Sequence, residues 1–245
     1  MATPDGRPRL AQVALGCRVS RADAEALAAG LTGHLRPCAG GEAADVVVVH
    51  TCTVTGDAAA TARQALRRAA REHPGARLVA AGCHAEVAPD ELAGLPGVAA
   101  VVGARRPEGL AEAVRRLAGA RRAVALEPPP EAAAGPASAG AARLLSAAVA
   151  PGLPAAPGRA RPLLKVQDGC DAACAYCAVP SARGPSRSRP FDEALSALLA
   201  LGRSHGEVVL TGVHLGRYGL DLAPARSLEG LVRAAVAGGL AARVR

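Results

Sequence analysis

The chain has 245 residues, enough for one large domain or two modest ones, and its core must rely on valine, leucine and alanine because only two tyrosines and one phenylalanine are aromatic. The formal net charge of +8 is carried almost entirely by arginine, which fits either a polyanionic partner such as RNA or a genome biased toward arginine and alanine codons. No apolar run could span a bilayer and the first ten residues do not resemble a signal peptide, which excludes a membrane protein and predicts a cytoplasmic one.

Three successive segments at the start of the chain share one pattern, in which a short apolar run ends in a cysteine and a helical segment follows. The runs cover residues 12–17, 45–52 and 77–83, and they end in Cys17, Cys52 and Cys83. Four consecutive valines in the second run are typical of a strand that is buried on both faces. A fourth apolar run at 98–102 predicts another strand, without a cysteine.

Helices are expected after each of these runs. Ser20, with Asp23 three residues later, predicts the N-cap of the first helix. The second helix is expected at 57–71, where a histidine, a proline and a glycine then close it. Shorter helical patterns follow at 89–93 and 107–117.

Strands and helices that alternate in this way imply an α/β fold with a doubly wound parallel sheet and right-handed crossovers. The carboxyl ends of the strands then share one edge of the sheet, where ligands bind in such folds. Cys17, Cys52 and Cys83, here called the sheet-edge cysteines, each lie just past the end of a strand and can converge there. Three thiolates suit an iron–sulfur cluster with one open iron, and three buried, inert cysteines are the alternative.

Cys38, His84 and the middle of the chain are not expected to bind a ligand. Cys38 lies in a loop outside the pattern and is expected to be an ordinary thiol. His84 follows Cys83 and is expected to lie behind the ligands or in solvent. Residues 126–160 are rich in proline, alanine and glycine, which predicts an interdomain linker with a possible short helix at 141–149.

The most specific motif is a group of three cysteines in the second half of the chain. Cys170, Cys174 and Cys177, here called the three-cysteine loop, are separated by three and then by two residues. Such a loop can offer three thiolates to a cubane iron–sulfur cluster and leave the fourth iron open for a small molecule. A structural zinc site needs four ligands, and no fourth Cys or His lies close by in the sequence.

The three-cysteine loop is expected at the carboxyl end of a strand. The pattern predicts this strand at 162–166, a helix at 191–201, a strand at 207–213, a helix at 228–237 and the start of a third strand at 242–245. This order predicts the beginning of a βα-barrel, whose chemistry lies at the carboxyl ends of its strands. Two βα units alone would leave an open sheet edge, so we expect an incomplete barrel in a truncated copy of a longer protein.

The Cys-x3-Cys-x2-Cys spacing, with Tyr176 before its last cysteine, resembles the radical S-adenosylmethionine superfamily. The surrounding residues resemble the methylthiotransferases in particular: KVQDG at 165–169, and Pro180, Arg183, Gly184, Arg187, Ser188 and Arg189. LGCRVS at 15–20, TCTVT at 51–55 and AGC at 81–83 are similar to the motifs that hold the auxiliary cluster in that family. His50 departs from the family's usual asparagine, which affects local hydrogen bonding but not the neighbouring cysteine.

This resemblance implies three regions and two kinds of cofactor. Residues 1–125 would form the methylthiotransferase N-terminal domain with the auxiliary cluster, 126–160 the linker, and 161–245 the N-terminal part of the radical S-adenosylmethionine domain. Two [4Fe-4S] clusters would be held by the sheet-edge cysteines and by the three-cysteine loop, and S-adenosylmethionine would bind the open iron of the second cluster. No catalytic residue beyond these ligands is implied.

The resemblance also assigns roles to residues around the clusters. Tyr176 would border the adenine of S-adenosylmethionine or pack at the barrel mouth, and Thr211 and Gly212 would lie near its methionine moiety. Candidates for contacts with RNA phosphates are Arg183, Arg187 and Arg189. The alternative is a solvated basic loop, or one that pairs with the carboxylate of S-adenosylmethionine or with the neighbouring domain. The implied partners are tRNA and an electron donor such as flavodoxin or ferredoxin, and the protein would be a monomer without membrane contact.

Two stretches indicate a branch of the family. TCTVT at 51–55 and LTGVHLGRYG at 210–219 look most like the enzymes that add a methylthio group to threonylcarbamoyladenosine next to the tRNA anticodon. The branches that act on isopentenyladenosine in tRNA, or on an aspartate of a ribosomal protein, usually differ there and are one alternative. The other alternative is an inactive fragment that only binds iron–sulfur clusters or zinc, together with RNA.

Overall fold

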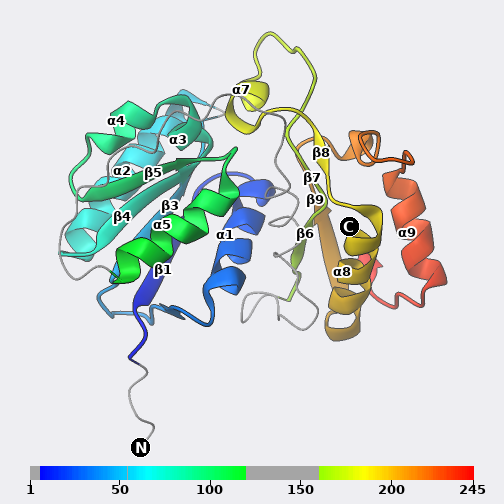
Figure 1. Ribbon diagram of the computed structural model, residues 1–245, viewed down its shortest axis with the longest axis horizontal. Coiled ribbons are helices and arrows are strands. Elements are labelled where there is room, and N and C mark those ends of the chain that lie inside the picture. The colour runs from blue at the N-terminus through cyan, green and yellow to red at the C-terminus, as the bar shows by residue number, and fades with distance from the viewer. Residues whose placement is uncertain (1–5, 54, 120–159) are drawn as a thin grey trace, which may run out of the picture. The chain divides into compact units, whose positions relative to one another are not determined.

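The computed structural model describes residues 6–53, 55–119 and 160–245 (Figure 1). Contacts divide the chain into two units: an N-terminal unit of residues 1–16 and 30–136, and a C-terminal unit of residues 17–29 and 137–245. The expected linker at 126–160, with its short helix at 141–149, lies almost wholly outside the described residues. Among the residues described, no helix is long and apolar enough to cross a membrane.

The N-terminal unit is built on the expected parallel sheet. Its five strands are β1 (Arg9–Ala14), β2 (Arg36–Pro37), β3 (Val46–Thr51), β4 (Arg77–Gly82) and β5 (Val98–Gly103). They lie in the order β2-β1-β3-β4-β5, and each neighbouring pair is parallel. Every residue of the central strand β3 is buried, which confirms the prediction made from its run of valines.

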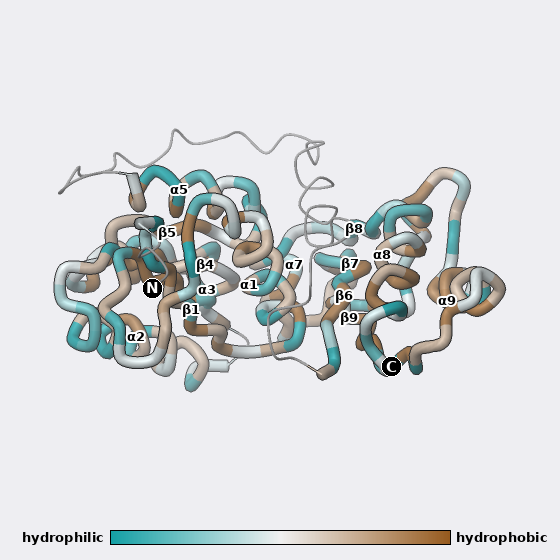
Figure 2. The backbone as a smooth tube through the Cα atoms, turned by 90° about the horizontal axis from the view of Figure 1, so that it is seen from below, coloured by the Kyte–Doolittle hydropathy of each residue, from teal (hydrophilic) through white to brown (hydrophobic). Residues whose placement is uncertain are grey.

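The helices of this unit are α2 (Gly56–Glu72), α3 (Cys83–Val87), α4 (Pro89–Ala93) and α5 (Pro107–Gly119). Figures 1 and 2 show α2 and α5 on opposite faces of the sheet, so helices cover both faces. Thr55 caps α2, because its Oγ1 accepts a hydrogen bond from the amide of Ala58 at 3.1 Å. One core cluster packs the apolar face of α2 against the strands without any aromatic residue; it consists of Ala44, Val47, Val49, Leu66, Ala69, Leu78, Ala80, Ala85 and Leu92.

Helix α1 (Arg18–Leu31) begins earlier than the sequence predicted. The amide of Arg21 donates to the carbonyl of Cys17 at 3.2 Å, so the first helical turn closes on Cys17. Ser20 therefore lies inside the helix, where it is buried, and the prediction that it caps the helix is wrong.

The C-terminal unit contains a second parallel sheet, with β6 (Leu163–Lys165), β9 (Glu207–Thr211) and β10 (Arg243–Val244) in the order β10-β9-β6. Its helices are α7 (Val179–Arg183), α8 (Phe191–Ser204), the 3-10 turn η1 (Leu215–Arg217) and α9 (Leu228–Ala237). The expected third strand at 242–245 is confirmed, because β10 pairs with β9. Three parallel strands are described here, and the barrel remains a prediction.

A short antiparallel pair was not predicted. Strand β7 (Gln167–Asp168) pairs with β8 (Arg187–Ser188). Tyr218 packs in the core of this unit, and its hydroxyl donates to the carbonyl of Arg189, just after β8, at 3.1 Å. The pair therefore forms a base for the three-cysteine loop, which the chain makes between β7 and β8.

Candidate functional site

The three-cysteine loop is closed at its base by backbone contacts. Gly169, which directly follows β7, has φ +70°, and a Cβ built there would lie only 1.9 Å from the carbonyl oxygen of Pro185. The amide of Cys170 donates to the carbonyl of Gly184 at 3.0 Å. Only glycine fits where the two ends of the loop come this close, so Gly169 sets the position from which Cys170 starts.

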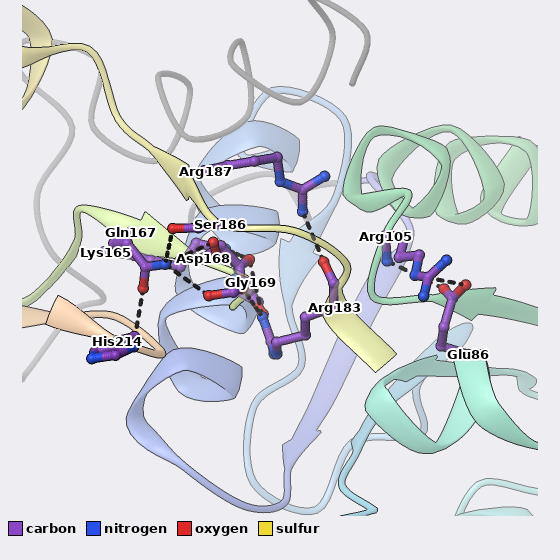
Figure 3. Close-up of polar contacts among 11 residues, drawn as sticks. Glu86, Arg105, Lys165, Gln167, Asp168, Gly169, Arg183, Ser186, Arg187 and His214 are labelled. Carbon is purple, nitrogen blue, oxygen red and sulfur yellow. Dashed lines mark hydrogen bonds and ion pairs between the residues drawn. The ribbon is translucent and has the colours of Figure 1, made fainter. Parts of the chain in front are cut away.

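The buried amide of Gln167 joins the two ends of the loop to the end of strand β9 (Figure 3). Its Nε2 donates to the carbonyl of Gly169 at 2.7 Å and lies 3.0 Å from Ser186 Oγ. Its Oε1 accepts from the backbone amide of His214 at 2.7 Å. One side chain thus holds both ends of the loop and the segment after β9, where part of a cofactor site is expected.

The cysteines of the loop differ in exposure. Cys170 is buried, Cys174 is exposed and Cys177 is partly buried. The amide of Cys177 donates to the carbonyl of Cys174 at 3.0 Å, and the amide of Ala172 points at Cys170 Sγ at 3.4 Å. In the described ranges, no three His, Cys, Asp or Glu side chains are gathered as a metal site.

The chemistry of this donor set nevertheless fits an iron–sulfur cluster. All three donors are thiols, and they lie between β7 and α7, in residues 169–178, which contain no helix or strand. Thiolates are the ligands that such clusters use, and an amide directed at a cluster sulfur is a common neighbour of that ligand. The ligand roles of all six cysteines stay predictions.

The other residues expected near the cofactor are Thr211, Gly212 and Tyr176. His214 Nδ1 is 3.7 Å from Cys170 Sγ, which brings the segment after β9 to the first cysteine. Thr211 is buried at the end of β9, and a Cβ on Gly212 would lie 3.0 Å from Gln167 Cβ. Tyr176 is 91% exposed, so its ring is available to a ligand and does not pack in the core of this unit.

Four charged side chains, here called the ion quartet, are joined by ion pairs: Asp23, Lys165, Asp168 and Arg183. Figure 3 labels the last three of them. Burial alone would raise the pKa of Asp168, but Lys165 and Arg183 outweigh that effect and hold this pKa below its usual value. Burial likewise opposes the charge on Lys165, yet Asp168 and Asp23 keep the pKa of Lys165 above its usual value. The quartet therefore consists of two anions and two cations at neutral pH.

Two of the sheet-edge cysteines follow neighbouring strands. Thr51 at the end of β3 is paired with Gly82 at the end of β4, and Cys52 and Cys83 come next in the chain. Gly82 has φ +102°, and a Cβ there would lie 2.7 Å from the carbonyl oxygen of Thr51. The parallel register thus places these two cysteines at the same edge, as expected.

The same edge is close to the end of β1. Gly16 has φ +101°, and a Cβ there would lie 2.9 Å from Cys52 Cβ. Cys17 is the next residue and is exposed. Two of the three sheet-edge cysteines therefore directly follow a glycine that no other residue could replace without strain.

Helix α3, which begins with Cys83, is fastened to the segment after β5. Glu86 Oε2 accepts from the backbone amide of Arg105 at 3.2 Å (Figure 3). A Cβ on Gly103 would lie 1.8 Å from the same oxygen, so the carboxylate fills the space above the end of β5. Cys83 is therefore held by a helix that is anchored at its far end.

The environments of three other residues bear on the sequence-based expectations. His50 is buried, and its Nε2 lies 2.8 Å from Gln12 Oε1, so the departure from the family's asparagine is accommodated by a hydrogen bond to β1. Cys38 Sγ donates to the carbonyl of Glu42 at 3.2 Å, as an ordinary thiol can. His84 is buried 3.3 Å from a Glu91 oxygen and does not lie in solvent.

Comparison with known proteins identifies the family that this chain resembles. Residues 9–103 match the uncharacterized protein family UPF0004. Over 217 residues the chain is 34% identical to the threonylcarbamoyladenosine tRNA methylthiotransferase MtaB of Bacillus subtilis (strain 168), which covers 85% of this chain and 44% of that protein. It is also 34% identical over 230 residues to the ribosomal protein uS12 methylthiotransferase RimO of Desulforudis audaxviator (strain MP104C), covering 91% of this chain and 48% of that protein. The chain belongs to the methylthiotransferase family.

A second MtaB, from Aquifex aeolicus (strain VF5), is 33% identical over 211 residues, which cover 84% of this chain and 48% of that protein. The chain thus spans slightly less than half the length of these methylthiotransferases. The matches cover most of the chain, and they divide between relatives that are named for a tRNA substrate and relatives that are named for a ribosomal protein.

The three arginines expected to contact RNA differ sharply in their exposure to solvent. Arg183 is 3% exposed and Arg189 is 1% exposed, whereas Arg187 is partly exposed. The guanidinium of Arg183 is held by Asp168, and Arg189, which directly follows β8, donates its backbone amide to the carbonyl of Val166. A buried guanidinium cannot reach a phosphate, so Arg187 is the one of the three that we carry forward as an RNA contact.

Sequence reasoning missed the residues that hold the loop. Gln167 and Asp168 belong to the KVQDG segment at 165–169, but their part in holding the loop depends on their burial, which the sequence does not show. Asp23 could not be found in this way, because its partners Lys165 and Arg183 are distant in the sequence.

Proposed function

We propose that this chain is the cluster-binding part of a radical S-adenosylmethionine methylthiotransferase that acts on tRNA in the cytoplasm. Its substrate would be threonylcarbamoyladenosine next to the anticodon, to which it adds a methylthio group. The observation that carries the proposal is the base of the three-cysteine loop, where Gly169 and Gln167 bring both ends of the loop and the end of β9 together. The similarity to MtaB over 85% of the chain supports the tRNA substrate.

Six cysteines of this chain would form two sets of cluster ligands. The three-cysteine loop would hold one [4Fe-4S] cluster and the sheet-edge cysteines the other. The bound clusters and S-adenosylmethionine would supply one-electron and radical chemistry, for which an electron donor such as flavodoxin or ferredoxin is the partner. No side chain has to act as a general base.

The protein's own part is to position the ligands. The amide of Ala172 and the imidazole of His214 approach Cys170 Sγ, where they can stabilise its thiolate. Gly212 lets the end of β9 lie close to Gln167, and the methionine part of the cofactor would bind near Thr211 and Gly212, while Tyr176 would offer a ring to the adenine. Arg187 would meet a phosphate of the tRNA.

A second candidate substrate has direct support. RimO of Desulforudis audaxviator matches 91% of the chain at the same 34% identity, which favours an aspartate of ribosomal protein uS12. The two substrates are distinguished by expressing the chain in bacteria that lack their own methylthiotransferases. Mass spectrometry of tRNA nucleosides and of uS12 peptides then shows which one carries the added group.

The reaction class is tested by cleavage of S-adenosylmethionine. The anaerobically reconstituted and reduced chain is expected to release 5′-deoxyadenosine and methionine. Cys174→Ser should abolish this release, and Cys38→Ser is the matched control, because the Cys38 thiol bonds to the nearby carbonyls of Ala39 and Glu42 and is no proposed ligand. Equal release from the wild type and from Cys174→Ser would overturn the proposal, and so would no release from a wild type whose two clusters are intact.

A further inference from the structure

Asp23 takes part in contacts that reach far beyond its own helix. We propose that Asp23 is a positioning residue, which fastens the segment after Cys17 to the segments on either side of the three-cysteine loop. Its importance for catalysis rests on the proposed function, because Cys17 and Cys170 would be ligands of two different clusters. The fastening itself can be measured without a cluster.

Hydrogen bonds close the ion quartet into a ring in which each carboxylate meets both cations. Lys165 Nζ donates to Asp23 Oδ1 and, at 3.0 Å, to Asp168 Oδ2. Arg183 Nη1 donates to both oxygens of Asp168 at 2.9 and 3.1 Å, while its Nη2 donates to Asp23 Oδ2 at 2.9 Å. Asp23 lies 142 residues before Lys165, whereas the other three members come from residues 165–183.

Burial makes this ring sensitive to the loss of one charge. The side chains of Lys165, Asp168 and Arg183 are 9%, 5% and 3% exposed, and that of Asp23 is 22% exposed. Without Asp23, two buried cations would share one carboxylate, and a buried charge without its partner is strongly unfavourable. Asp23 therefore balances the charge and bridges two parts of the chain.

The ring lies next to proposed ligands on both sides. Helix α1, which carries Asp23, begins directly after Cys17, whose carbonyl accepts the first helical hydrogen bond. Asp168 is bonded to the amide of Gly169, the residue before Cys170. Residues 17–29 group with the C-terminal unit although the strands before and after them, β1 and β2, belong to the N-terminal sheet. Asp23 supplies the charged contacts that fit this grouping.

Hydrogen–deuterium exchange of the metal-free full chain tests the proposal. Asp23→Asn keeps the shape of the side chain and removes its charge, so exchange in the peptide 17–29 is expected to rise about tenfold while α2 stays unchanged. The matched control is Glu112→Gln, which removes an exposed helical ion pair with Arg116 and should leave 17–29 unaffected. Unchanged exchange of 17–29 in Asp23→Asn would overturn the proposal.

A double variant separates fastening from charge balance. Asp23→Asn with Lys165→Met leaves a neutral pair of Asp168 and Arg183, so the base of the loop should regain its protection and the protein should fold even where Asp23→Asn alone does not. Peptide 17–29 should still exchange fast, because the charged contacts of Asp23 with Lys165 and Arg183 are then gone. Recovery of wild-type protection at 17–29 would show that Asp23 only balances charge, and would overturn the proposal. Neither readout depends on iron or S-adenosylmethionine, so failure of the proposed function would be seen separately.

Discussion

The sheet-edge cysteines and the three-cysteine loop are positioned by different means. Cys52 and Cys83 follow paired residues of two parallel strands, so the backbone register places them and glycines give the chain room to turn. Cys170 follows a two-residue strand and depends on buried side chains, above all Gln167 and Asp168. Backbone register tolerates most side-chain changes, whereas a loop held by a few polar side chains depends on each of them. Substitutions can remove either the backbone support of the sheet-edge cysteines or the side-chain support of the three-cysteine loop.

The largest effect is expected when the ion quartet loses its most buried acid. Asp168→Asn leaves Asp23 as the one carboxylate of the quartet beside its two buried cations, and breaking such a pair costs about 3–5 kcal/mol. Chemical denaturation of the metal-free chain should show this loss, while Asp90→Asn, at an exposed position in α4, should change stability by less than about 0.5 kcal/mol. A loss below about 1 kcal/mol for Asp168→Asn would contradict the assigned role of the quartet.

The pH dependence of the same variant gives a second readout. The pKa of Asp168 is below its usual value in the folded protein, so its stabilisation is present above the pKa of an unfolded aspartate, about 3.9, and is lost as the pH falls below that value. The wild type should therefore lose more stability than Asp168→Asn between about pH 5 and pH 3. Equal losses would contradict this linkage.

A substitution at the sheet edge should have the next largest effect. Gly82→Ala places a Cβ 2.7 Å from the carbonyl of Thr51 at a positive φ, which we expect to cost about 2–3 kcal/mol. It should lower iron binding by the sheet-edge cysteines and spare the three-cysteine loop. Gly33→Ala is the control, since nothing lies within 4 Å of a Cβ there. An unchanged melting temperature and iron content for Gly82→Ala would contradict the claim that the backbone sets this edge.

Loss of the Gln167 amide group should lower the stability of the fold somewhat less than Gly82→Ala does. Gln167→Met keeps the volume of the side chain but removes its bonds to Gly169 and to the His214 amide, which we expect to cost about 2 kcal/mol. Exchange of the peptide 167–186 should rise with it. Gln64→Met, at an exposed position of α2, should be nearly neutral. Wild-type protection of 167–186 in Gln167→Met would mean that the backbone alone closes the loop.

The smallest effect on stability is expected at His214. His214→Phe removes a ring nitrogen 3.7 Å from Cys170 Sγ, and because His214 is exposed the fold should lose less than about 1 kcal/mol. The reduction potential of the cluster on the three-cysteine loop should fall, since hydrogen bonds to cluster sulfurs favour the reduced state. His34→Phe, at an exposed position in the other unit, should leave the potential unchanged. An unchanged potential in His214→Phe would exclude this contact.

Local patterns predicted the regular parts of the molecule well. The valine run gave β3, and the helices α4 and α9 have the predicted bounds. The first helix begins before Ser20 because Cys17 closes its first turn, and the pair β7–β8 was missed because two-residue strands leave no periodic pattern.

The candidate site likewise has parts that local patterns predict and parts that depend on tertiary packing. The sequence identified the cysteines, but it could not show that Asp23 meets Lys165 and Arg183, since residues so far apart are paired only by the folded chain. Nor could it show that Arg183 and Arg189 are interior cations, because a basic loop and a buried ion network have the same composition. Burial is decided by tertiary packing, which no local pattern contains.

The central claim is that the two cysteine sets hold separate clusters, and a metal count tests it most directly. Iron and acid-labile sulfide would be measured after anaerobic reconstitution of the wild type, of the Cys170/Cys174/Cys177→Ala variant, of the Cys17/Cys52/Cys83→Ala variant and of Cys38→Ala. We predict about eight irons per chain in the wild type and in Cys38→Ala, and about four in each triple variant. Zinc in place of iron, or an undiminished iron content in either triple variant, would contradict the account.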